Sequence, residues 1–131
     1  MGENTQRGRD DAFFERARTV AATGNTEYSI EMYLQGLNIA PDLVAIHRKL
    51  RQVCLQRTSS GGKSLGMYEV MKLQAVRRGP IDRMLAREKL LCYEPGNVDY
   101  MIAFCEAAHD AGAFATEKWV RELIEKVKES T

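Results

Sequence analysis

The stretch FFERARTVAATGNTEYSIEMYLQGLNIAPD, residues 13–42, decides the fold expected for this chain of 131 residues. Apolar residues recur at helical spacing on both sides of Gly24-Asn25, and the second pattern ends at Pro41, 17 residues after Gly24. The same signals return later, because Pro95 ends one helical pattern and Gly112 interrupts the next, again 17 residues apart. Turn signals that alternate in this way predict a helix–turn–helix unit of about 34 residues.

The longer intervals between these signals indicate a single insertion. Pro41 lies 54 residues before Pro95, and Gly24 lies 88 residues before Gly112. Each interval exceeds a whole number of units of about 34 residues by roughly twenty, so one extra segment lies between Pro41 and Pro95. The period predicts three repeats, at about residues 10–43, 44–97 and 98–129.

The inserted segment is expected at about residues 59–79, inside the second repeat. Counting from Pro41 places the turn of that repeat near Thr58, beside the loop at Gly61-Gly62. The later part of the insertion has apolar residues at helical spacing, and Gly79-Pro80 is a stop signal for that helix. Seven helices are therefore expected, six from the repeats and one inserted. The side chains expected to supply the contacts of the insertion are Met67, Tyr68 and Met71.

Gly36 stands in the middle of the second helical pattern. Glycine in a helix interior costs about 1 kcal/mol relative to alanine. Its presence predicts a place where two helix backbones approach each other closely.

Several of these residues resemble a known repeat. The matching features are an aromatic residue early in the first helix, Gly24-Asn25, Ser29 followed by Ile30, Tyr33, Gly36 and the closing Ala-Pro-Asp. On these features the chain resembles a tetratricopeptide repeat protein, and its overall pattern is similar to that of small bacterial proteins of planctomycetal type. The resemblance covers about residues 12–129, apart from the insertion. It departs at Arg16, where leucine is usual, and in the split second repeat.

The resemblance implies an all-α, right-handed α-α superhelix that works as a non-enzymatic scaffold or adaptor. In that family the first helices of successive repeats line a concave groove that holds a peptide or a helix. Projected onto this chain, the groove is basic at one end and acidic at the other, which would orient a charged ligand. The expected groove residues are Phe14, Arg18, Arg48, Lys49, Gln52, Ile102, Glu106 and His109.

The sequence allows three placements of the inserted helix: it could fold over the groove, pack on an outer face, or present its methionines to a partner. Our hypothesis is that it shapes or partly fills the groove, because it is apolar and tethered by a glycine loop. An alternative function is self-assembly, in which copies stack through terminal helices or the inserted helix.

Composition narrows the class of partner. Nineteen basic and eighteen acidic residues give a net charge of +1, so no global charge attracts nucleic acid or an anionic membrane. No apolar run approaches the roughly 20 residues of a membrane span. Residues 1–10 are polar, without an apolar signal core, and are expected to form a loose tail on a cytoplasmic protein. A protein or peptide partner, or a second copy, is the expectation that remains.

Residues with potential chemistry have structural explanations. Gly61-Gly62-Lys63-Ser64 is similar to the end of a phosphate loop, but Arg57 occupies the position of the first glycine and a helical pattern precedes it. His47 is expected to be half-buried in the core, and His109 to face a helix C-terminus. We expect no enzyme activity, cofactor or metal. The expected buried, reduced thiols are Cys54, Cys92 and Cys105.

Overall fold

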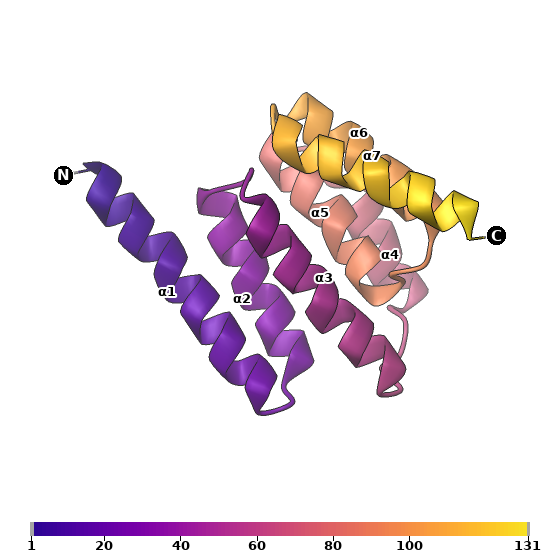
Figure 1. The fold of residues 1–131 in the computed structure, drawn as a ribbon, viewed down its shortest axis with the longest axis horizontal. Coiled ribbons are helices and arrows are strands. Elements are labelled where there is room, and N and C mark those ends of the chain that lie inside the picture. Colours follow the sequence, from indigo (N-terminus) through magenta and orange to yellow (C-terminus); the bar gives the residue numbers. More distant parts are fainter. Residues whose placement is uncertain (1, 131) are drawn as a thin grey trace.

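The computed structural model describes residues 2–130, with side chains described from Gly8 onward. Over this range the chain is all-helical, with seven helices and no strand (Figure 1). The helices are α1 (Gly2–Ala22), α2 (Thr26–Ile39), α3 (Val44–Ser59), α4 (Met67–Gln74), α5 (Pro80–Tyr93), α6 (Val98–Asp110) and α7 (Phe114–Glu129).

Consecutive helices pack in pairs, as in a helical repeat protein. The closest pairs are α1 with α2, α5 with α6, and α6 with α7, and α3 joins the two halves through α2, α5 and α7 (Figure 1). The all-α fold and the seven helices predicted from the sequence are therefore confirmed. The insertion also falls where the period places it, because α3 ends at Ser59 and α5 begins at Pro80, with α4 between them.

The core is a single cluster that runs through all the helices except α4. Its largest fully buried side chains come from all three repeats, so the repeats share one core. The fully buried apolar members are Ala17, Ile30, Leu37, Leu50, Cys54, Met84, Met101, Phe104, Ala108, Ala113 and Val120.

The turns have the backbone geometry that the period requires. Gly24 and Gly112 adopt φ angles of +89° and +73°, a region that favours glycine. Asn25 and Asn97 then cap α2 and α6, since each side chain accepts a hydrogen bond from the backbone N–H three residues ahead. Gly24 and Asn25 therefore end α1 and begin α2 within one turn, whereas Asn97 begins α6 and Gly112 follows its end.

The close approach at Gly36 involves a side chain and not a second backbone. A Cβ atom at Gly36 would lie 2.3 Å from the Phe14 ring, which stacks on Tyr33. The prediction of a tight site is correct, but its physical cause is an aromatic ring of α1 that lies flat against α2.

The N-terminal segment is helical, where a loose tail was expected. Helix α1 begins at Gly2, and Asp10 is only 7% exposed. The segment contains no proline, and each added residue extends an existing helix at little cost once later turns are packed. Met1 lies outside the described residues.

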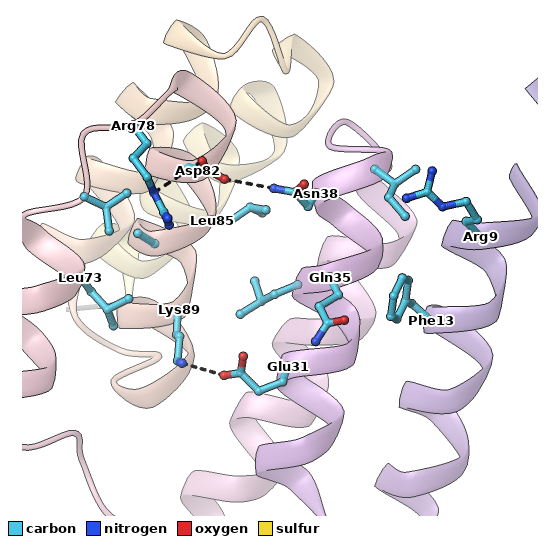
Figure 2. A pocket seen from close by; sticks show the side chains of 14 residues that line it. Arg9, Phe13, Glu31, Gln35, Asn38, Leu73, Arg78, Asp82, Leu85 and Lys89 are labelled. Carbon is cyan, nitrogen blue, oxygen red and sulfur yellow. Dashed lines mark hydrogen bonds and ion pairs between the residues drawn. The ribbon is translucent and has the colours of Figure 1, made fainter. Parts of the chain in front are cut away.

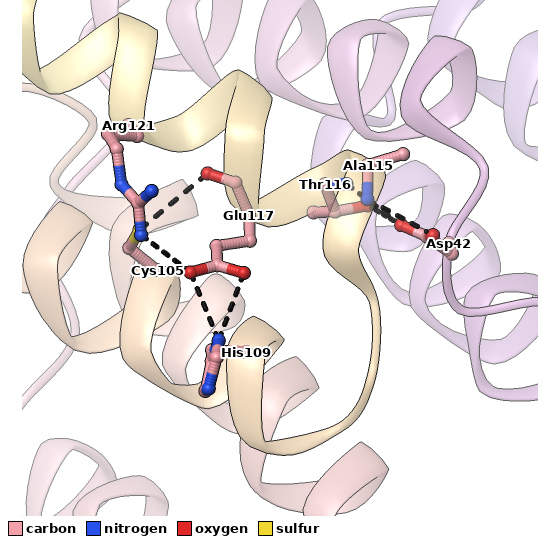
Figure 3. A network of polar contacts seen from close by, with 7 residues as sticks. All are labelled: Asp42, Cys105, His109, Ala115, Thr116, Glu117 and Arg121. Carbon is pink, nitrogen blue, oxygen red and sulfur yellow. Dashed lines mark hydrogen bonds and ion pairs between the residues drawn. The ribbon is translucent and has the colours of Figure 1, made fainter.

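Asp42 caps the N-terminus of the last helix, α7, although it lies far from that helix in the sequence (Figure 3). Its carboxylate accepts hydrogen bonds from Ala115 N, at 3.2 Å, and from the N–H and Oγ1 of Thr116, both at 2.8 Å. Ala113, the residue before α7, makes no side-chain cap of its own. Asp42 follows α2 directly, so this contact fixes α7 to the end of the first repeat.

We expect Asp42→Ala to lower the free energy of unfolding by about 1–2 kcal/mol, because the first turn of α7 loses its capping oxygens. Urea unfolding followed by circular dichroism measures the change. Asp42→Asn keeps one acceptor oxygen and should lose clearly less. Equal losses in the two variants would show that the hydrogen bonds to α7 are not the cause.

Candidate functional site

The groove predicted on the first helices is divided in the structure. Phe14, Arg18 and Lys49 do lie together around a shallow hollow of about 300 Å³ between α1, α2 and α3. However, the Phe14 ring is only 9% exposed and packs against Tyr33, so it is mainly a core residue. Arg18 forms an ion pair with Glu15 at 3.1 Å within its own helix.

The C-terminal part of the predicted groove forms a separate hollow of about 480 Å³ between α6 and α7. Here Glu117 accepts from His109 at 3.1 Å and from Arg121 at 2.6 Å, beside Cys105 (Figure 3). Glu106 lines the same hollow. The remaining predicted residues are exposed and line neither hollow: Arg48, Gln52 and Ile102.

The inserted helix packs through residues other than the predicted ones. Met67, Tyr68 and Met71 are 80%, 72% and 60% exposed, so their assignment as packing contacts is wrong. Helix α4 lies against α5, and Arg87 of α5 donates a hydrogen bond to Leu73 O at 2.7 Å. The packing side of α4 is the one that carries Leu73, because that side faces α5 while the methionines face outward.

A larger groove lies on the side of the second helices (Figure 2). We call this groove of about 510 Å³, formed by α1, α2, the end of α4, the segment after α4, and α5, the second-helix groove. Its apolar lining residues are Phe13, Leu34, Ile39, Leu73, Val76, Leu85 and Ala86. Its polar and charged lining residues are Arg9, Glu31, Gln35, Asn38, Arg78, Asp82 and Lys89.

Polar side-chain contacts join α2 to α5 along the second-helix groove (Figure 2). Asn38 of α2 donates to Asp82 of α5 at 3.2 Å, and Lys89 of α5 pairs with Glu31 of α2 at 2.7 Å. Arg78 approaches Asp82 at 3.9 Å. These bonds hold the two second helices at a fixed spacing, so the groove exists before any ligand binds.

The insertion therefore shapes a groove, but a different one from the groove expected. Leu73, Val76 and Arg78 form one wall of the second-helix groove, and no residue of the insertion lines the hollow at Phe14. The resemblance to tetratricopeptide repeats predicted a groove on the first helices. The sequence signal for a groove on the second helices was the position of the insertion, which lies immediately before the second helix of the middle repeat.

A buried ion pair lies at the centre of the molecule. The His47 side chain is fully buried, where half-burial was expected, and its Nδ1 lies 2.7 Å from Glu88 Oε2. His47 Nε2 donates to the carbonyl oxygen of Pro41 at 2.8 Å, and the ring packs near Phe104 and Trp119. The adjoining cavity of about 10 Å³ holds one water at most. The pair is therefore built into the core and has no room for a substrate.

The three cysteines are buried and reduced, as expected. Burial raises the pKa of the Cys92 thiol, and the neighbouring Cys54 raises it further. Burial also raises the pKa of Cys105. A raised pKa disfavours the nucleophilic thiolate, so Cys92 and Cys105 act as small apolar side chains. Among the described residues, no group of three or more His, Cys, Asp or Glu is placed to hold a metal ion.

Comparisons of the chain with protein-family models, with curated proteins and with solved structures gave no match. Within residues 2–130, no helix is both long enough and apolar enough to cross a membrane.

Proposed function

We propose that the protein is a non-catalytic interaction scaffold of the tetratricopeptide type, which holds a peptide or helix of another cytoplasmic protein. The observation that carries the proposal is the second-helix groove, about 510 Å³ in volume, with apolar side chains inside and polar side chains at its edge. Concave sites of this composition are the usual places where proteins bind ligands.

The architecture supports this role. The groove is made by elements from two repeats and the insertion, and the ties from Asn38 to Asp82 and from Lys89 to Glu31 fix its width. Phe13, Ile39, Leu73 and Val76 are only partly buried there. A ligand that covers these side chains gains the free energy of their removal from water without first ordering the site.

A blocked groove tests the proposal. Gln35 lies on the exposed surface of α2 inside the groove, so Gln35→Trp should fill part of it without disturbing the core. Gln52 is an exposed residue of the predicted first-helix face, and Gln52→Trp is the matched control. We expect peptides selected from an unbiased display library on the wild-type protein to bind Gln35→Trp at least about tenfold more weakly.

The same peptides should bind Gln52→Trp with the affinity of the wild type. The opposite result, with loss on Gln52→Trp only, would move the site to the first helices. A selection that enriches no peptide would reject the scaffold function.

The exposed methionines favour a second candidate, self-assembly through the inserted helix. Met67, Tyr68 and Met71 leave an apolar surface on one helix, and such surfaces often mark contacts between proteins. Sedimentation over a hundredfold range of concentration tests this candidate. A mass that stays at 14.8 kDa rejects it.

A further inference from the structure

The charges of the chain are strongly segregated although the net charge is only +1. Residues 43–93 contain eleven Lys and Arg but only three Asp and Glu. Residues 1–42 contain four basic and seven acidic residues, and residues 94–131 contain four basic and eight acidic residues. The positive charge is therefore concentrated in the middle repeat, which supplies one wall of the second-helix groove.

At the groove itself, two cations lie on opposite walls. Arg9 of α1 and Arg78 of the segment before α5 both line it from opposite sides (Figure 2). None of the ion pairs among residues 8–130 involves Arg9, and Arg78 is 81% exposed with only a long contact to Asp82. The two acidic residues at the edge are already engaged: Glu31 by Lys89, and Asp82 by Asn38.

More positive charge lies directly behind the wall. Arg83 and Arg87 lie one turn apart on α5, and Arg87 is bonded to the carbonyl oxygen of Leu73, a groove residue. Burial lowers the pKa of Arg87, and the nearby charges of Arg77 and Arg83 lower it further. Cations that repel one another close to an apolar groove are stabilised when an anionic ligand approaches.

We propose that the second-helix groove binds an acidic peptide segment with an apolar face, whose carboxylates meet Arg9 and Arg78 on the two sides. This inference rests on the proposed scaffold function and adds the chemical class of its ligand. An anionic peptide fits better than a nucleic acid, because the apolar lining of the groove is aliphatic apart from Phe13, and single-stranded bases bind mainly by stacking on aromatic side chains.

Two synthetic, fluorescently labelled helical peptides test the charge class. Both carry the same apolar face, and their remaining positions are glutamate in one peptide and lysine in the other. Fluorescence anisotropy should show that the wild-type protein binds the glutamate peptide at least about tenfold more tightly than the lysine peptide at low salt. Added salt should weaken the binding of the glutamate peptide.

Charge-reversed variants locate the effect. Arg9→Glu with Arg78→Glu should reduce binding of the glutamate peptide at least about tenfold. The matched control is Arg48→Glu with Lys49→Glu, which changes the net charge equally on the first-helix face and should change binding less than about threefold.

Three results would overturn the acidic-peptide proposal. The first is equal binding of the two peptides, or of neither peptide, by the wild type. The second is an equal loss in both double variants. The third is tighter binding of a single-stranded oligonucleotide, lost in the Arg9→Glu, Arg78→Glu variant. The display selection described above separates these results from failure of the scaffold function. If the selected peptides were neutral or basic and Gln35→Trp blocked their binding, the scaffold function would stand and only the acidic class of ligand would be rejected.

Discussion

Glu88→Ala is expected to lower the free energy of unfolding by about 3–5 kcal/mol, the largest effect that we expect of a single polar substitution here. His47 is fully buried and Glu88 is 4% exposed. Because a carbonyl oxygen only accepts, His47 Nε2 must donate to Pro41 O, which leaves Nδ1 to share a proton with Glu88. Removal of the carboxylate leaves that nitrogen buried without its partner.

The pair also gives stability a defined pH dependence. Burial lowers the pKa of His47, but the charge of Glu88 and the hydrogen bonds that His47 donates to Glu88 and Pro41, with a smaller contribution from Asp42, outweigh burial and raise it overall. A raised folded-state pKa contributes stability that is complete below the ordinary histidine pKa of 6.5 and is lost as pH rises through the folded-state pKa. Urea unfolding at a series of pH values from 6 upward should show this decline.

Two further variants identify the cause. Glu88→Gln can donate its amide to a neutral His47, so it should lose less stability than Glu88→Ala and should lack the decline above pH 6.5. Replacing both residues by apolar ones, His47→Phe with Glu88→Leu, should recover at least half of the loss. A wild-type pH profile identical to that of Glu88→Gln would mean that His47 is not charged in the folded protein.

The fold was predictable because its signals are local and periodic. Gly24 and Gly112 end helices through their positive φ angles, and the prolines at 41 and 95 mark the same point of each unit. A repeat architecture converts such local signals into a global arrangement, because each unit packs on its neighbour in the same way. The insertion could be located for the same reason, as a departure from the period.

The contacts that span the chain could not be predicted in this way. Asp42 caps a helix that begins more than seventy residues later, and His47 pairs with Glu88 across 41 residues of chain. Neither pairing has a sequence signal, since each depends on how two repeats stack. The second-helix groove was missed for a related reason: its wall residue Leu73 is identified only once the side of α4 that faces α5 is known.

Arg57 joins three parts of the chain at the start of the insertion. Its side chain is 7% exposed, and its Nε donates to Glu27 Oε2 at 2.7 Å. Its Nη2 donates to Lys63 O at 2.6 Å, and the guanidinium lies 4.3 Å from the centre of the Tyr93 ring. The glycine at 62 fits this arrangement, because a Cβ there would lie 2.7 Å from Arg57 Cγ. The loop that looked like a free tether in the sequence is therefore held by one arginine.

Arg57→Ala is expected to lower the free energy of unfolding by about 2–4 kcal/mol, since it removes two charge-assisted hydrogen bonds, a cation–π contact and the packing of the side-chain stem. The loss stays below that of Glu88→Ala because the carboxylate left behind, Glu27, is 58% exposed and regains water. Urea unfolding measures the global loss. A protease that cleaves after lysine measures the local one, because release of the loop should speed cleavage at Lys63.

Two matched variants separate the contacts of Arg57 from its charge. Arg57→Lys keeps the charge but cannot donate to Glu27 and Lys63 together, so it should recover less than half of the lost stability. Arg48→Ala, an exposed position on the same helix, should change stability by less than about 0.5 kcal/mol and leave cleavage at Lys63 unchanged. If Arg57→Lys behaved as the wild type in both assays, charge alone would hold the loop.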